Sequence, residues 1–307
     1  MQIDFRFQLF FKRNAGLPLG GAETGREQPR HEKCKEKLPQ VHHFVLHSSG
    51  GDLGEQFAVS PAPNYTRILF DERVKSPVAA ILLMVSPVTD QSERAPVLLQ
   101  TYRQYLQREN TAAFIRDVAR QYQIGTLERL AESSTPDIRR AAMLSLCFLA
   151  DFGSNATVGR ALCDIDRGVR LIAENGIRNL WVRAGSTLQR RQLERVAGHL
   201  RATSWHDAVI DATTLIHHAP WYAEAHYFRG EAYFRRQVWE LAARDNHQAL
   251  EINPYHFPAA ICLAQCNLHQ GETILALENF RRALRLNPNL DAVRSQVGYL
   301  ERQLEQN

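Results

Sequence analysis

Hydrophobic residues recur every three to four positions over most of the chain after residue 96, which predicts amphipathic helices. Between residues 97 and 106, one helical face carries Leu98, Leu99, Tyr102, Tyr105 and Leu106. A cleaner stripe follows at Val169, Ile172, Ala173, Gly176, Ile177 and Leu180. The one candidate strand, residues 79–85, is equally compatible with a buried helix. The pattern therefore predicts an all-α fold for this part of the chain.

One predicted helix is apolar on nearly every side. It begins after Thr135, a favourable N-cap residue, with Pro136 at the first helical position and Gly153 as a plausible stop. A helix that is hydrophobic all round must be covered on all sides. We therefore expect it to be sandwiched between neighbouring helices.

The first 63 residues have a different composition from the rest. They are rich in glycine and proline, and the stretch GREQPRHEKCKEKLPQ is charged and almost free of apolar residues. Such a segment buries too little surface to offset its chain entropy, so residues 1–63 are predicted to be mostly disordered. A start codon placed too early would produce a similar pattern. Residues 64–96 are left without a predicted fold.

Charge and cysteine usage indicate which binding partners and which cellular compartment to expect. The 307 residues carry a net charge of +4, and no part of the chain is basic enough to indicate nucleic-acid binding. The five cysteines are an odd number without a Cys-x-x-Cys pair, which is typical of a reducing compartment. The apolar stretch 78–86 is too short to span a bilayer, and no signal-peptide cleavage site follows the N-terminal apolar run. We expect a soluble cytoplasmic protein that is not bound to a membrane.

Three sets of residues repeat at a spacing of 34. The prolines are Pro220, Pro254 and Pro288. Twelve residues before them stand Ala208, Ala242 and Ala276, and five residues before them stand Leu215, Ala249 and Ala283. A fixed period of this length is the signature of a repeat architecture.

These positions make residues 187–307 resemble the tetratricopeptide repeat (TPR) family. The resemblance implies pairs of antiparallel helices with small residues at the eighth position, here Gly230, Ala264 and Gly298. His226 and Ala260 depart from the tryptophan usual at the fourth position, and Asn246 departs from an aromatic. We expect two good repeats, a degenerate one before them and a closing helix over about 290–305.

Residues 97–186 resemble HEAT-like repeats more weakly. TPDIRRAA and DIDRGVRLIA share an acid, an apolar residue, an arginine and small residues, with Asp137 and Asp166 at matching places. The resemblance implies that Asp137 pairs with Arg139 or Arg140, and Asp166 with Arg170. The fold class expected overall is a right-handed helical-repeat solenoid, HEAT-like and then TPR-like, fused end to end.

The sequence contains only weak matches to catalytic and metal-binding motifs. The DFG at 151–153 lacks the other parts of a kinase site, so Asp151 is read as the end of a helix. Cys262, Cys266 and His269 share one side of a helix with metal-ligand spacing, but free cysteines commonly pack as small hydrophobes. We find no catalytic constellation and expect no cofactor and no metal.

The concave face of the repeats is the remaining candidate surface. In the TPR family, five positions of each first helix line this groove. Transferred to this chain, they are Glu224, Tyr227, Glu231, Phe234, Arg235, Ile261, Gln265, Leu268, His269, Tyr299 and Arg302. The lysines that clamp a terminal carboxylate in chaperone-binding members are missing, because no lysine follows residue 75.

The expected function is a non-catalytic scaffold that binds a protein or peptide partner in this groove. Two alternatives stay open. One is an enzyme or nucleic-acid-processing protein built on the HEAT-like surface, and the other is a purely architectural, self-associating module.

Overall fold

The computed structural model describes residues 96–306, and all regular structure within them is helical. The first helices are α4 (Val97–Arg108), α5 (Thr111–Gln121), α6 (Ile124–Leu130), α7 (Pro136–Leu149), the 3-10 turn η1 (Phe152–Ser154), α8 (Asn155–Ala161) and α9 (Arg167–Arg183). The later helices are α10 (Thr187–Arg201), α11 (Trp205–His218), α12 (Ala223–Arg235), α13 (Trp239–Ile252), α14 (Phe257–His269), α15 (Thr273–Leu286) and α16 (Asp291–Gln306). The predictions for residues 1–95, including the strand candidate, lie outside the described residues.

Helix α7 is the centre of the N-terminal half. Nine consecutive residues from Arg139 to Cys147 are buried, which confirms that this helix is sandwiched between neighbours. It begins at Pro136 as predicted but ends at Leu149, before Gly153. The expected stripe of α9 faces it, and the closest approach is at Gly176. A Cβ atom there would lie 2.1 Å from Sγ of Cys147, so only glycine permits this spacing.

Ion pairs bind α7 to the start of α9. The guanidinium of Arg140 contacts Asp166 at 2.6 Å and Asp137 at 2.9 Å, and Arg139 contacts Asp164 at 2.8 Å. The pairing of Asp137 with Arg140 is thereby confirmed. Arg139 binds Asp164, in the turn before α9, and Arg140 binds Asp166, the N-cap of α9, each with two parallel bonds. Such bidentate pairs fix geometry as well as adding energy.

The expected pair of Asp166 and Arg170 is wrong. Arg170 instead donates to the backbone oxygen of Asp164 at 2.8 Å and to Oδ1 of Asn289 at 3.2 Å. Asp166 is the N-cap of its own helix and already accepts from Val169 and Arg140. The charge of Asp166 is therefore paired with Arg140 of α7 and not with Arg170. The HEAT-like assignment itself stays a prediction.

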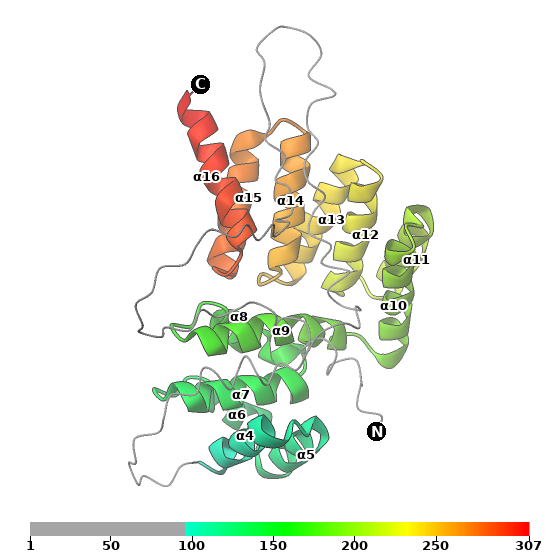
Figure 1. The fold of residues 1–307 in the computed structure, drawn as a ribbon. Coiled ribbons are helices and arrows are strands. Elements are labelled where there is room, and N and C mark those ends of the chain that lie inside the picture. The colour runs from blue at the N-terminus through cyan, green and yellow to red at the C-terminus, as the bar shows by residue number, and fades with distance from the viewer. Residues whose placement is uncertain (1–95, 307) are drawn as a thin grey trace, which may run out of the picture.

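The C-terminal half consists of repeated helix pairs. Helices α10 and α11, α12 and α13, and α14 and α15 pair in turn, and α16 packs on α15 (Figure 1). The alanines that stand twelve residues before the repeated prolines, Ala208, Ala242 and Ala276, are each fully buried. The helix-pair prediction is confirmed, and the degenerate first unit also forms a complete pair.

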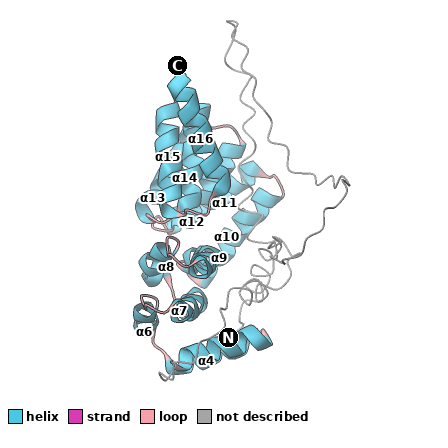
Figure 2. Ribbon diagram, turned by 60° about the vertical axis from the view of Figure 1, so that its left-hand side comes forward, coloured by secondary structure: helices cyan, strands magenta, loops and turns pink. Residues whose placement is uncertain are grey.

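The two halves are not joined as one continuous stack. Helices α8 and α9 run crosswise beneath the ends of the repeat helices, as Figure 1 shows, and Figure 2 shows α7 and α9 nearly end-on below them. Helix α9 meets three successive turns of the repeats. Tyr222 donates to the backbone oxygen of Val182 at 2.7 Å, His256 stacks on Trp181, and Asn289 donates to Glu174 at 3.1 Å.

These three contacts follow the repeat period. Tyr222 and His256 are 34 residues apart, and Asn289 lies within one residue of the next such position. A 17-residue helix is about 25 Å long, enough to cross several helix pairs. The two halves therefore meet side to end, because α9 runs along the turn-bearing edge of the repeats.

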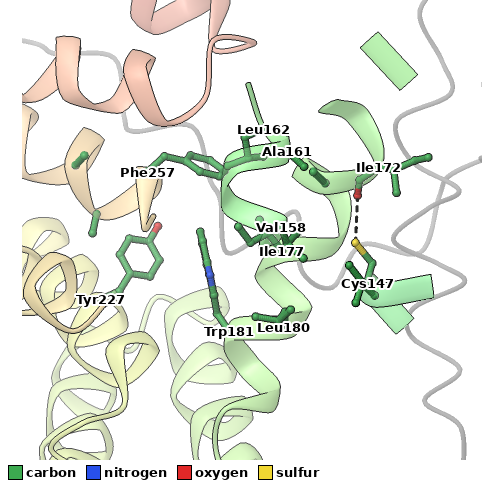
Figure 3. Packing of buried hydrophobic residues seen from close by; sticks show 14 of the residues in the cluster. Cys147, Val158, Ala161, Leu162, Ile172, Ile177, Leu180, Trp181, Tyr227 and Phe257 are labelled. Atoms are coloured by element: carbon green, nitrogen blue, oxygen red, sulfur yellow. Dashed lines mark hydrogen bonds between the residues drawn. The ribbon is translucent and has the colours of Figure 1, made fainter. Parts of the chain in front are cut away.

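Trp181 is the centre of this junction (Figure 3). Its Nε1 donates to Oδ1 of Asn155 at 2.7 Å, and Nδ2 of Asn155 donates to Oδ1 of Asn253 at 2.8 Å. The indole also packs against Phe257, with ring centroids 5.9 Å apart. A chain of buried side-chain hydrogen bonds thus connects α8, α9 and the turn before α14.

Candidate protein-binding groove

The residues predicted for the groove lie on three successive first helices of the pairs. On α12, Glu224, Tyr227 and Glu231 are spaced three and four residues apart and share one face. Ile261, Gln265, Leu268 and His269 follow on α14, and Tyr299 and Arg302 on α16. The structure thereby places all of them on the α12–α14–α16 series.

Most of these side chains are much less accessible than an open groove implies. Six of them are at most 7% exposed, namely Glu224, Tyr227, Glu231, Phe234, Ile261 and Gln265. Leu268, His269 and Arg235 are partly buried, and Tyr299 and Arg302 are exposed. The predicted set therefore divides into a deep part and an accessible rim. We call Leu268, His269, Tyr299 and Arg302 the rim.

In the first turn of α12, the buried side chain of Glu224 contacts His256. Nδ1 of His256 accepts from the backbone nitrogen of Ala259 at 3.1 Å, so in the neutral ring the proton is on Nε2. That proton is donated to Oε1 of Glu224, with Nε2 and Oε1 3.2 Å apart. The second carboxylate oxygen, Oε2, is buried without a hydrogen-bond partner. Glu224 therefore has one unused acceptor in the interior.

Between the two ends lies Tyr227. Its ring contacts that of His256, with centroids 4.8 Å apart. Burial raises the pKa of Tyr227 well above its ordinary value, with a further contribution from the nearby carboxylate of Glu231. The phenol is therefore neutral over the whole physiological range. Glu231 itself lies 3.8 Å from Arg235, one turn further along α12.

An aromatic cluster lies near the C-terminal end of α12. The rings of Trp239 and His269 stack with centroids 3.9 Å apart and an angle of 2° between their planes. Phe234 meets both rings edge-on, at 5.1 Å from Trp239 and 5.7 Å from His269. Burial lowers the pKa of His269 below 6.5, so this ring is neutral at pH 7. The cluster is therefore uncharged, and it includes His269 of the rim.

Trp239 was not among the predicted residues. It is the first residue of α13, on the second helix of its pair, whereas the family positions come only from first helices. The signal available in the sequence was an aromatic residue directly after the turn that ends α12. Only the stack on His269, 30 residues away, shows that it borders the groove.

The residues considered for a kinase-like or metal site have structural roles instead. Asp151 caps η1 by accepting from the backbone nitrogen of Gly153 at 2.9 Å. Cys262 and Cys266 are buried in a small cluster with Phe234 and Ala242. The hydrogen bond with Cys266, together with burial, raises the pKa of Cys262 well above its ordinary value, which keeps the thiol protonated. Within residues 96–306, no three His, Cys, Asp or Glu side chains are grouped to hold a metal ion.

Between residues 96 and 306, none of the helices combines the length and the hydrophobicity that a transmembrane span requires.

Similarity to known proteins was found only among solved structures. No family model matches the chain. No curated protein matches it in sequence either. Among solved structures, the first TPR domain of Spaghetti (RPAP3) bound to the HSP90 peptide SRMEEVD is 18% identical, with a TM-score of 0.38, over 39% of this chain and 96% of that one. The TPR2AB domain of yeast Sti1 in complex with an HSP90 peptide is 15% identical, with a TM-score of 0.34, over 68% of this chain and 98% of that one. The helix pairs set 34 residues apart are what make residues 187–306 a TPR-like helical repeat.

Proposed function

We propose that this protein is a non-catalytic scaffold that binds a segment of another protein on the α12–α14–α16 face. The observation that supports this proposal is the accessible rim on α14 and α16. Tyr299 is 37% exposed and Arg302 is exposed on α16, and His269, the rim residue on α14, stacks on Trp239. Tyrosine, tryptophan and arginine are the side chains that most often carry binding energy at interfaces. We place this activity in the cytoplasm, on the grounds of cysteine usage.

The rim suits recognition because its scaffold is rigid. Below it, Ile261, Gln265 and the cysteines of α14 are buried, so the exposed side chains stand on a packed helix. Neutral His269 and protonated Tyr227 leave the centre of this face without a pH-sensitive charge at pH 7. A partner with an apolar or aromatic anchor therefore fits better here than one recognised by charge alone.

The test is affinity capture with the full chain. The groove variant is Leu268→Ala/Tyr299→Ala/Arg302→Ala, which changes accessible side chains and leaves the deep residues intact. The matched control is Leu188→Ala/Trp221→Ala/Arg191→Ala, because these side chains are exposed and lie on α10 and in the turn between α11 and α12, on none of the rim helices. Circular dichroism checks that both variants fold.

We expect a partner that binds wild type and the control but binds the groove variant at least about tenfold more weakly, since each anchor contributes on the order of 1 kcal/mol or more. A partner that binds all three equally would place the interaction elsewhere on the chain. Self-association that survives in the groove variant, without any partner, would favour an architectural module instead.

A further inference from the structure

The turn between α11 and α12 is held by a histidine. His226, the fourth residue of α12, places Nε2 2.9 Å from the backbone oxygen of Pro220. A carbonyl oxygen can only accept a hydrogen bond, so the proton of the neutral ring is on Nε2. The other ring nitrogen, Nδ1, is buried and has no hydrogen-bond partner in the described structure. The fold therefore accommodates the neutral ring, with an unused lone pair on Nδ1.

A proton on Nδ1 would lie in unfavourable surroundings. The charged groups that act on the ring are Asp245 and Arg244 of α13 and Arg229 of α12 itself. Asp245 attracts a cation, but both of its carboxylate oxygens already accept from Arg229, at 2.6 and 2.8 Å. On α11, Arg229 contacts the uncharged hydroxyl of Thr213. Burial, with a smaller contribution from the two arginines, lowers the pKa of His226 below its ordinary value of 6.5.

The equivalent position of the other repeats has no such group. Six residues after each repeated proline stand His226, Ala260 and Arg294. Ala260 has no side-chain donor. Arg294 donates to the backbone oxygen of Pro288, just as His226 donates to Pro220, but its guanidinium is exposed and keeps its charge at every physiological pH. Of these three positions, the one in the α11–α12 turn thus has the donor that titrates near neutral pH.

The α11–α12 turn is also a contact between the two halves of the molecule. Tyr222, two residues after Pro220, donates from its hydroxyl to the backbone oxygen of Val182 in α9 at 2.7 Å. Within the turn, the backbone nitrogen of Tyr222 donates to Ala219, and that of Ala225 donates to Tyr222, both at 3.0 Å. Opening of the turn therefore moves a residue that holds α9 against the repeats.

We propose that His226 makes this turn acid-sensitive, so that protonation of Nδ1 opens the α11–α12 turn and releases Tyr222 from α9, while the α15–α16 turn stays closed. In the open turn the ring is solvated and takes up a proton near its ordinary pKa of about 6.5, whereas the closed turn resists the proton. The closed form is therefore most stable above about pH 6.5 and loses stability as pH falls toward the lowered pKa of the buried ring. This inference does not depend on the partner of the proposed function.

Hydrogen exchange of the full chain at pH 7.5 and pH 5.5, corrected for intrinsic exchange rates, measures the opening of each turn. A proton taken up with a pKa of about 6.5 by the open form alone raises the open population by up to about tenfold between these two values. We expect a rise of this size in peptides that cover residues 219–225. Peptides that cover residues 288–294, in the α15–α16 turn, should not change.

Two variants assign the effect to His226. His226→Gln keeps an N–H donor for Pro220 but does not titrate, so the acid dependence of the α11–α12 turn should disappear. His226→Trp, the residue usual at this repeat position in TPR proteins, is a second donor without a titration. His217→Gln, which replaces an exposed histidine of α11, is the matched control and should keep the acid dependence. If neither variant closes the turn at pH 7.5, the comparison of the two turns in wild type decides.

Each outcome has a defined meaning. A rise confined to the α11–α12 turn, present in wild type and His217→Gln and absent without His226, supports the proposal. No acid-dependent rise in this turn overturns it. An equal rise in the α15–α16 turn also overturns it, because acid then weakens the fold as a whole. A rise that persists without His226, or one found only in the α13–α14 turn, overturns it as well, since another group such as His256 then titrates.

Discussion

The α7–α9 pair and the α12–α13 pair use the same device for close approach but are aligned by different means. In each, a glycine of one helix faces a side chain of the other, Gly176 against Cys147 and Gly230 against Asn246. The α7–α9 pair is then oriented by Arg139 and Arg140, which reach acids 25 and 26 residues away. The later pairs are oriented by turns that recur every 34 residues.

This difference shows two ways of specifying a helical stack. Periodic turns place every pair in the same relation to the next, so the information is spread over many equivalent positions. Bidentate ion pairs place one helix against one partner, so the information is concentrated in a few side chains. We therefore expect single substitutions to be more damaging in the N-terminal half than at equivalent surface sites of the repeats.

The largest effect is expected for Arg140→Ala. Arg140 contacts Asp137 and Asp166, and its side chain is only 10% exposed. Removing one member of a buried pair leaves the other charges without compensation and costs about 3–5 kcal/mol. Urea unfolding monitored by circular dichroism measures this. Arg294→Ala in α16 is the control, because Arg294 and Asp291 are both exposed and such pairs contribute less than about 1 kcal/mol. Similar losses for both would contradict the comparison.

A smaller effect is expected for the glycines at the helix crossings. A Cβ at residue 176 would overlap the short side chain of Cys147, so Gly176→Ala should lower the free energy of unfolding by about 1–3 kcal/mol. At Gly230 the atom in the way is the end of the Asn246 amide, at 2.6 Å, which has more freedom to move. Gly230→Ala should therefore cost less than Gly176→Ala.

Gly125→Ala is the matched control for both glycines. Nothing lies within 4 Å of a Cβ at residue 125 in α6, so the substitution should stabilise the helix by up to about 1 kcal/mol. The ranking is measured by urea unfolding of the three variants. A Gly176→Ala protein as stable as wild type would show that α7 and α9 separate at no cost.

The smallest effect concerns the pH dependence of the ion pairs. The hydrogen bond from Arg140 lowers the pKa of Asp166 below its ordinary value of 3.8. A carboxylate with a lowered pKa stabilises the fold above its unfolded pKa and loses this contribution as pH falls through the folded value. Asp166→Asn keeps an N-cap acceptor for Val169 and removes the charge.

We therefore expect Asp166→Asn to cost about 1–2 kcal/mol near pH 7, the size of a partly exposed charge-assisted hydrogen bond. The difference from wild type should shrink as pH falls below about 4 and vanish below the folded pKa. Thermal unfolding of both proteins between pH 2 and pH 7 measures it. A difference that stays constant over this range would mean that the charge of Asp166 contributes nothing.

The helices were predictable because their signals are local. The stripe at Val169, Ile172 and Ala173 and the start of α7 at Pro136 depend only on the 3.6-residue period and on the geometry of helix ends.

The candidate groove was predictable in position but not in accessibility. Family spacing placed Glu224, Tyr227 and Glu231 on one face of α12, and that face is present. Their burial and the stack of Trp239 on His269 depend on residues from other helices, which spacing within one helix does not specify. The accessible part of the candidate site is therefore limited to the rim, and it is smaller than the transferred positions implied.

By itself, the sequence determined the helical content, the 34-residue period and the helix pairs that follow from it, because periodicity, small residues and turn prolines act over one or two helices. The tertiary structure decided how α9 lies across the repeat turns, that Arg140 pairs with Asp166, and that Glu224 is enclosed beside His256. These features join residues 26 to 119 positions apart. At such separations, the partner of a side chain is set by the packing of whole helices.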